Sequence, residues 1–251
     1  MTLRFFPLFT SYIYKLCSDQ SSLIYTTEHV LSSFQADGVV YLELRTTPRA
    51  LPDANISKGA YVDTVLSCIS EHDVESQMHT NLILSIDRRN TLEEAMEVVE
   101  LAIARKSRGV VGVDLCGNPA RVLNPAFGQA FAKAKQAGLK VTLHFAETPV
   151  SSTDEELQIL LSWEPDRLGH LCLVNDVFRE EIVSKNIGVE LCLTCNVSAK
   201  MISGTFCDHH FGWWKESGVG VALGVSTHFR IYLPLRSVAN NYVRPMMLAY
   251  F

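Results

Sequence analysis

The sequence predicts an α/β protein built as a TIM-type (β/α)8 barrel that is incomplete, because its first strand is missing. Three observations lead to this prediction. Seven short runs rich in β-branched residues alternate with helix-length segments, and no glycine-rich G-x-G-x-x-G turn follows any of them. Charged and imidazole side chains stand at the carboxyl ends of most of these runs, where the active sites of parallel barrels lie.

The alternation of apolar runs and amphipathic segments sets the expected elements. We expect strands over residues 39–44, 82–87, 110–115, 140–145, 167–171, 187–193 and 219–223. We expect helices over 22–36, 58–70, 91–106, 125–137, 153–163 and 177–185. Thr91 and Thr153 are suitable N-caps, and Gly138 and Gly188 are suitable helix stops. Residues 1–20 offer no strand, which would leave two barrel edges unpaired and lower the stability.

Composition restricts the class of protein. With 251 residues, of which 47% are hydrophobic and 20% charged, the chain can bury a large core. We expect one barrel domain over 1–224 and a divergent segment of unknown role over 225–251. The net charge of −5 argues against nucleic acid as a partner, and the absence of a long apolar run argues against a membrane. Seven cysteines at irregular spacing suit a reducing compartment, so a cytoplasmic location is expected.

His144 and Glu147 form the most specific element of the expected site. On the strand 140–145, Thr142 and His144 share the face that points into the barrel, and Glu147 follows just past the strand. An imidazole at the barrel mouth with a carboxylate three residues later suits a metal ligand beside a general acid or base. The alternative is a core histidine satisfied by hydrogen bonds and an unrelated loop carboxylate.

Two other clusters are weaker candidates. The first has the spacing of a zinc site and consists of Cys192, Cys195, Cys207 and His210. It is disfavoured because residues three apart on a strand point to opposite faces. The second is expected to be an amphipathic turn that packs on the barrel, and it consists of His209, His210, Trp213 and Trp214.

Five stretches of the sequence point to a known family. They are 41–49 (YLELRTTPR), 112–119 (GVDLCGNP), 142–147 (TLHFAE), 167–170 (RLGH) and 191–196 (LCLTCN). In this order they resemble the adenosine and AMP deaminases, and within that family the branch that acts on N6-methyl-AMP. The resemblance runs from about residue 5 to about residue 224.

The resemblance implies hydrolytic deamination at C6 of a purine by zinc-activated water. It identifies His144 with a zinc ligand, Glu147 with the group that protonates purine N1, and His170 with the histidine that orients or polarises the attacking hydroxide. It identifies Gly117 with a glycine whose backbone contacts the purine. Residues identified with the ribose-phosphate end of the substrate are Thr46, Thr47, Pro48, Arg49 and Asp87. Threonine donors and a fixed cation there favour a nucleotide over a nucleoside. We also expect a monomer that acts on a small purine nucleotide or nucleoside.

The sequence departs from the family pattern at the residues that would bind the metal. The resemblance implies a first strand with His-x-His and a last strand that ends in Asp-Asp, and the chain contains neither. Of the four protein ligands that the family implies, only His144 is recognisable, and His228 is a weak substitute near the missing aspartates. The chain therefore resembles a truncated or alternatively spliced product, or the product of a gene model that misses an exon at each end.

Catalytic zinc sites need about three protein ligands, so we expect little or no deaminase activity from this chain. Two alternatives stay open: a catalytically dead regulator that binds nucleotides, and a metal-independent barrel lyase or isomerase that uses Glu147 and His170 as an acid–base pair.

Overall fold

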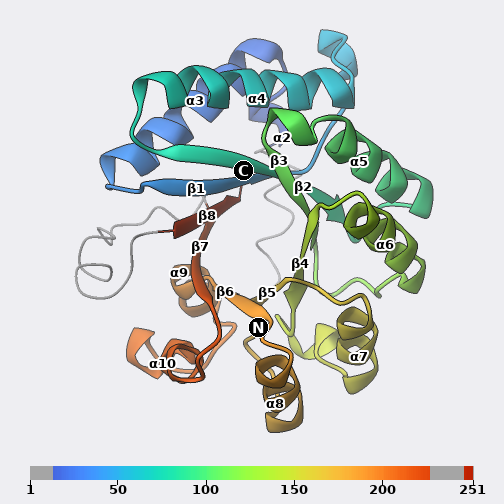
Figure 1. Ribbon diagram of the computed structural model, residues 1–251, viewed down its shortest axis with the longest axis vertical. Coiled ribbons are helices and arrows are strands. Elements are labelled where there is room, and N and C mark those ends of the chain that lie inside the picture. Colours follow the sequence, from blue (N-terminus) through green and yellow to red (C-terminus); the bar gives the residue numbers. More distant parts are fainter. Residues whose placement is uncertain (1–13, 227–245, 251) are drawn as a thin grey trace.

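The computed structural model describes residues 14–226 and 246–250, which form a closed parallel barrel with strand order β1-β2-β3-β4-β5-β6-β7-β8 (Figure 1). The strands are β1 Tyr41–Thr46, β2 His79–Asp87, β3 Val110–Cys116, β4 Lys140–Phe145, β5 Arg167–His170, β6 Gly188–Leu191, β7 Val221–Ser226 and β8 Met246–Tyr250. The predicted (β/α)8-type barrel is confirmed, and the seven predicted strands correspond to β1 through β7.

Helices surround the strands in Figure 1. The α-helices of the described residues are α2 Tyr14–Leu16, α3 Gln20–Ala36, α4 Lys58–Glu75, α5 Leu92–Ala104, α6 Gly128–Gln136, α7 Asp154–Ser162, α8 Asp176–Ser184, α9 Leu193–Ser198 and α10 Phe211–Glu216. Short 3-10 helices lie at η3 Pro52–Ala54, η4 Lys106–Arg108, η5 Pro125–Phe127, η6 Pro149–Ser151 and η7 Phe206–Asp208. None of these described helices has both the length and the hydrophobicity that a bilayer span requires.

The predicted caps are present where a threonine precedes the helix. Thr91 accepts a hydrogen bond from the backbone of Glu94 and forms a capping box with it, and Thr153 accepts one from Glu156. Gly188, in contrast, opens β6 instead of ending a helix, because Asn186 already takes the left-handed turn after α8 with φ 49°.

The two expected unpaired edges do not exist, because β8 fills the gap between β7 and β1. Tyr41 of β1 aligns with Met246, and Leu223 of β7 aligns with Met247, both in parallel register. Residues 14–40 contain α2 and α3 and no strand. The barrel sheet therefore includes part of the segment 225–251, and β7 itself runs to Ser226.

Alternation along β4 places its side chains as predicted. Val141, Leu143 and Phe145 are buried in the apolar core shared with the helices. Thr142 and His144 instead contact polar groups of other strands: Thr142 donates to Glu190 at 2.9 Å, and His144 lies 3.1 Å from Asp114. The inside of the barrel is therefore polar along this strand.

Candidate functional site

The candidate site lies at the carboxyl ends of β3, β4 and β5. His144 stands one residue before the end of β4, Glu147 follows that strand, and His170 is the last residue of β5. The chain turns sharply there, since Ala146 and His170 have φ values of 49° and 67°, which are uncommon for residues with a side chain. Such backbone strain often accompanies functional positions.

His144 is held by a buried carboxylate. Its Nδ1 lies 3.1 Å from Oδ1 of Asp114, which is fully buried on β3, and Ser85 donates to Oδ2 of Asp114 at 3.0 Å. Burial alone would raise the pKa of Asp114, but the charges of His144 and Arg45 outweigh it, so that pKa is lowered. Burial lowers the pKa of His144, and the neighbouring Asp114 carboxylate more than restores it, so the net shift is upward.

His170 and Glu147 face each other across the mouth. The distance from Nε2 of His170 to Oε1 of Glu147 is 3.7 Å, and both residues are buried. The rings of His144 and His170 have centroids 5.1 Å apart. Burial lowers the pKa of His170, which keeps this imidazole neutral at physiological pH. The structure thus brings together the three residues for which the sequence predicted chemistry.

Below these residues an ion-pair network fills the barrel. Arg45, with a side chain only 1% exposed, lies 3.4 Å from Asp114 and 2.5 Å from Glu190. Arg167 lies 2.8 Å from Glu190 and also pairs with Glu43. Burial raises the pKa of Glu190, but the charges of Arg45 and Arg167 more than offset that, so the pKa is lowered. The network couples β1, β3, β5 and β6 beneath the site.

Residues predicted for the ribose-phosphate end gather at the ends of β1 and β2. The hydroxyls of Thr46 and Tyr61 are 2.8 Å apart, and Thr47 lies 3.6 Å from the thiol of Cys116. Pro48 is buried beside them, and Asp87 accepts two hydrogen bonds from the guanidinium of Arg89, at 2.9 and 2.8 Å.

Arg49 is more constrained than a free loop cation. Its guanidinium lies over the ring of Tyr14, 4.4 Å from the centroid, and donates to the backbone carbonyls of Tyr14 and Cys17 at 3.3 Å each. Helix α2 thus reaches the mouth of the barrel. No local pattern indicates Tyr14 as a site residue, because its contact with Arg49 spans 35 positions.

Gly117 follows β3 with φ of 105°, a conformation that residues with a Cβ rarely adopt. A Cβ at this position would lie 2.7 Å from Oδ1 of Asp87. The backbone of Gly117 therefore passes close to a residue of the candidate substrate end.

We expect Gly117→Ala to lower the free energy of unfolding by about 1–3 kcal/mol, from the strained φ and the clash with Asp87. Urea denaturation measures this change. Gly220→Ala is the matched control, since a Cβ there meets nothing within 4 Å, and it should change stability by less than about 0.5 kcal/mol. Equal effects of the two substitutions would contradict the close approach at Gly117.

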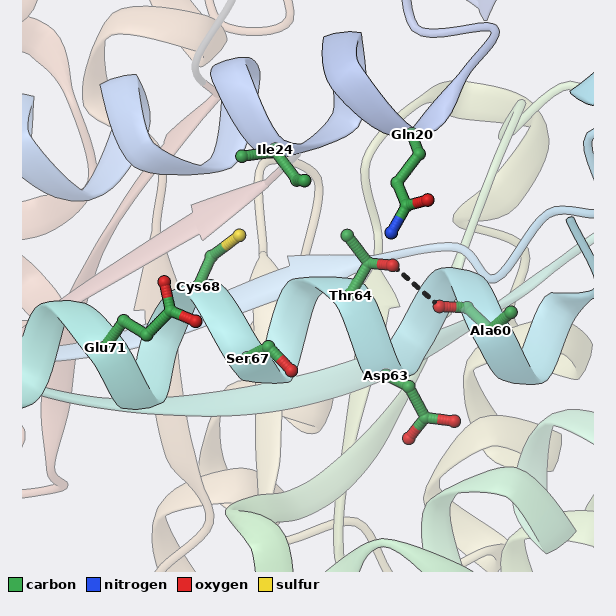
Figure 2. Close-up of a pocket in the computed structure, with 8 residues that line it drawn as sticks. All are labelled: Gln20, Ile24, Ala60, Asp63, Thr64, Ser67, Cys68 and Glu71. Carbon is green, nitrogen blue, oxygen red and sulfur yellow. Dashed lines mark hydrogen bonds between the residues drawn. The ribbon is translucent and has the colours of Figure 1, made fainter.

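A groove of about 470 Å³ lies apart from the site, between α3 and α4 on the outside of the barrel (Figure 2). Its polar groups are engaged locally: Thr64 donates to the carbonyl of Ala60 at 3.0 Å, and Asp63 pairs with Arg105 at 2.7 Å. The groove therefore offers no convergent set of groups for chemistry.

The described residues do not fit the zinc that the resemblance implies. No group of three or more His, Cys, Asp or Glu side chains in 14–226 and 246–250 is arranged to hold a metal ion, and this includes the cysteine cluster. The one recognisable ligand, His144, directs Nδ1 at Asp114, and that carboxylate also contacts Arg45 and Ser85. His228 lies outside the described residues.

The sequence profile of the family described as Adenosine deaminase matches residues 3–227. The chain belongs to the adenosine deaminase family. It is 37% identical to the N6-mAMP deaminase of Arabidopsis thaliana over 221 residues, which is 79% of this chain and 61% of that protein. It is 34% identical to the N6-Methyl-AMP deaminase of Homo sapiens, over 80% of this chain and 59% of that protein. The chain thus spans about three fifths of the length of these curated relatives.

Solved structures of the family are similar to this chain in fold. The crystal structure of Arabidopsis ADAL complexed with IMP superposes with a TM-score of 0.80 at 37% identity, over 87% of this chain and 65% of that one. The same protein complexed with GMP superposes with a TM-score of 0.81, with the same coverage of both chains.

Proposed function

We propose that this member of the adenosine deaminase family binds purine mononucleotides at the carboxyl ends of β1 to β5 and turns them over slowly or not at all. The observation that carries the proposal is the meeting of Glu147 and His170, 3.7 Å apart, beside a barrel mouth where the described residues hold no set of ligands that fits zinc. The family reaction is hydrolytic deamination at C6 of N6-methyl-AMP or a related adenine nucleotide or nucleoside.

The proposed roles follow from chemistry and position. Glu147 is the proton donor to purine N1, and His170 contacts the C6 substituent. Gly117 lies against the purine through its backbone, where a side chain would not fit. Zinc, when bound in complete family members, supplies the activated water, and His144 would be its ligand in this chain. The set described here lacks the other ligands, so no step is assigned to a metal.

The preference for a nucleotide rests on the cations at the end of β1 and β2. Arg49 is half-buried, and Arg89, 40% exposed, lies beside Asp87. A phosphate oxygen accepts strong charge-assisted hydrogen bonds from a guanidinium. Similar proteins have been solved with IMP and with GMP, which agrees with a phosphate-bearing ligand.

Calorimetric titration tests this proposal. We expect AMP, IMP and N6-methyl-AMP to bind at least about tenfold more tightly than adenosine, because one hydrogen bond to a charged group contributes about 1.5–3 kcal/mol. Arg49→Met should weaken nucleotide binding by about tenfold or more and leave adenosine unchanged. Lys58→Met, on the outer surface, is the control and should change neither. Equal affinities for AMP and adenosine would refute the nucleotide assignment.

We also propose that the chain works as a monomer in the cytoplasm and acts on small molecules, without nucleic acid or membrane partners. All seven cysteines are free thiols, which supports a reducing compartment.

A further inference from the structure

A chain of hydrogen-bonding groups leads from the backbone of α10 to His170. In the structure the side-chain oxygen of Asn196, fully buried on α9, lies 2.8 Å from Nδ1 of His170. Its side-chain nitrogen lies 3.0 Å from Nε2 of His209, which is 7% exposed. The backbone N–H of Phe211 donates to Nδ1 of His209 at 3.0 Å.

We call this chain of hydrogen-bonding groups the relay. At its outer end, the donor and the acceptor can be assigned in only one way. A backbone N–H is always a donor, so Nδ1 of His209 must be the acceptor and carries no proton. A neutral imidazole has one N–H, which then resides on Nε2. Burial, together with the charges of His210 and His170, lowers the pKa of His209 to about 4, so this ring is neutral at physiological pH.

The position of the proton on the His209 ring determines the orientation of the Asn196 carboxamide. The two ends of a carboxamide have the same shape, and their partners decide which end is oxygen. Since His209 donates from Nε2, the two ends of the carboxamide are interchanged relative to their placement in the structure: the oxygen of Asn196 faces His209 and the amide nitrogen faces His170. The placed orientation, with the nitrogen toward His209, would require both ring nitrogens of His209 to accept, which a neutral imidazole cannot do.

We infer that the relay from Phe211 through His209 and Asn196 fixes His170 in the tautomer with its proton on Nε2. Nδ1 of His170 then accepts from Asn196, and Nε2 presents an N–H to the barrel mouth on the side of Glu147. His209 and Asn196 are positioning residues, because they act on the site only through His170.

This inference deepens the proposed function, and its catalytic meaning rests on that function. With Nε2 protonated, His170 donates a hydrogen bond to an acceptor atom at the C6 side of a bound purine. It does not take a proton from water at Nε2. His210 holds the same residue from another side, with Nε2 2.8 Å from the backbone oxygen of His170.

Long-range ¹H–¹⁵N NMR on the full chain with ¹⁵N-labelled histidine reads the tautomer directly, and His170→Gln assigns the signals by their loss. In the native chain at neutral pH we expect a protonated Nε2 and a bare Nδ1 at His170. Asn196→Asp should move the proton to Nδ1, because a carboxylate offers only acceptors to His170. A native His170 with its proton on Nδ1 would overturn the inference, as would an unchanged tautomer in Asn196→Asp.

A second pair of variants separates positioning from packing. His209→Gln keeps an amide donor at the place of Nε2 and should preserve the His170 tautomer, whereas His209→Asn loses that donor and should give a mixture. His29→Gln, at an exposed histidine, is the control and should leave the His170 signals unchanged. Equal tautomer populations in the two His209 variants would refute the relay. Should the variants not fold, the native tautomer alone decides, and since no nucleotide or turnover is needed, this result is independent of the proposed function.

Discussion

The 251-residue chain is expected to deaminate AMP, adenosine and N6-methyl-AMP at least about 10²–10³-fold more slowly than a complete relative such as the Arabidopsis N6-mAMP deaminase. Loss of one well-placed electrostatic group in an active site commonly has an effect of this size. This sequence lacks several such groups, since it has no His-x-His and no acidic residue beyond Glu216.

The strand that pairs with β1 on the side opposite β2 supports this expectation of slow turnover. The resemblance implies a ligand-bearing strand that precedes Tyr41–Thr46, and a strand that precedes β1 in a parallel barrel would pair on the side opposite β2. In this structure β8 pairs there. Its sequence, Met-Met-Leu-Ala-Tyr, contains no histidine or carboxylate.

The ultraviolet absorbance change on loss of the 6-amino group measures the rate for both proteins under the same conditions. Glu147→Gln is the internal control: any residual turnover that belongs to this site should disappear in the variant. Turnover within tenfold of the relative, abolished by Glu147→Gln, would contradict the expected loss.

The second large effect concerns stability. We expect Arg45→Met to lower the free energy of unfolding by about 3–5 kcal/mol, because removal of one partner leaves Asp114 and Glu190 buried without this compensating charge. Arg167 still pairs with Glu190, so Asp114 is the more affected carboxylate.

Urea denaturation monitored by circular dichroism gives the difference. Lys58→Met is the matched control, because it removes one partner of the exposed pair with Glu97 and should cost less than about 1 kcal/mol. If Arg45→Met costs no more than Lys58→Met, the buried network does not stabilise the barrel as described.

Local patterns were sufficient to predict most of the barrel. The strand 140–145 was predicted to the residue, because strict alternation and the flanking glycine and carboxylate mark both ends. The same alternation predicted that His144 points into the barrel and that Glu147 follows the strand, and these two residues mark the centre of the candidate site.

Strand β8 could not be predicted, because its five residues do not alternate between apolar and polar side chains and so give no signal for a half-buried strand. Its pairing partner Tyr41 lies about two hundred positions away in the chain, beyond any local signal.

The pairing of the histidines at 209 and 210 with the site was also missed. The sequence interpretation was a turn that packs on the barrel, which holds for Trp214, fully buried at that place. His209 instead reaches Asn196, 13 positions away, and His210 reaches the backbone of His170, 40 positions away. The neighbouring aromatic residues suggest packing, and only the fold reveals the polar partners.

Zinc content by elemental analysis of the purified full chain, dialysed after exposure to zinc, tests the central claim most directly. The central claim is that the chain keeps the residues that contact the purine in the family site, Glu147, His170 and Gly117, but lacks the set of metal ligands of that site. Well below one zinc per chain is predicted, with His144→Ala unchanged in zinc content. One zinc per chain, lost in His144→Ala, would contradict the account and would place further ligands of a metal centre around His144.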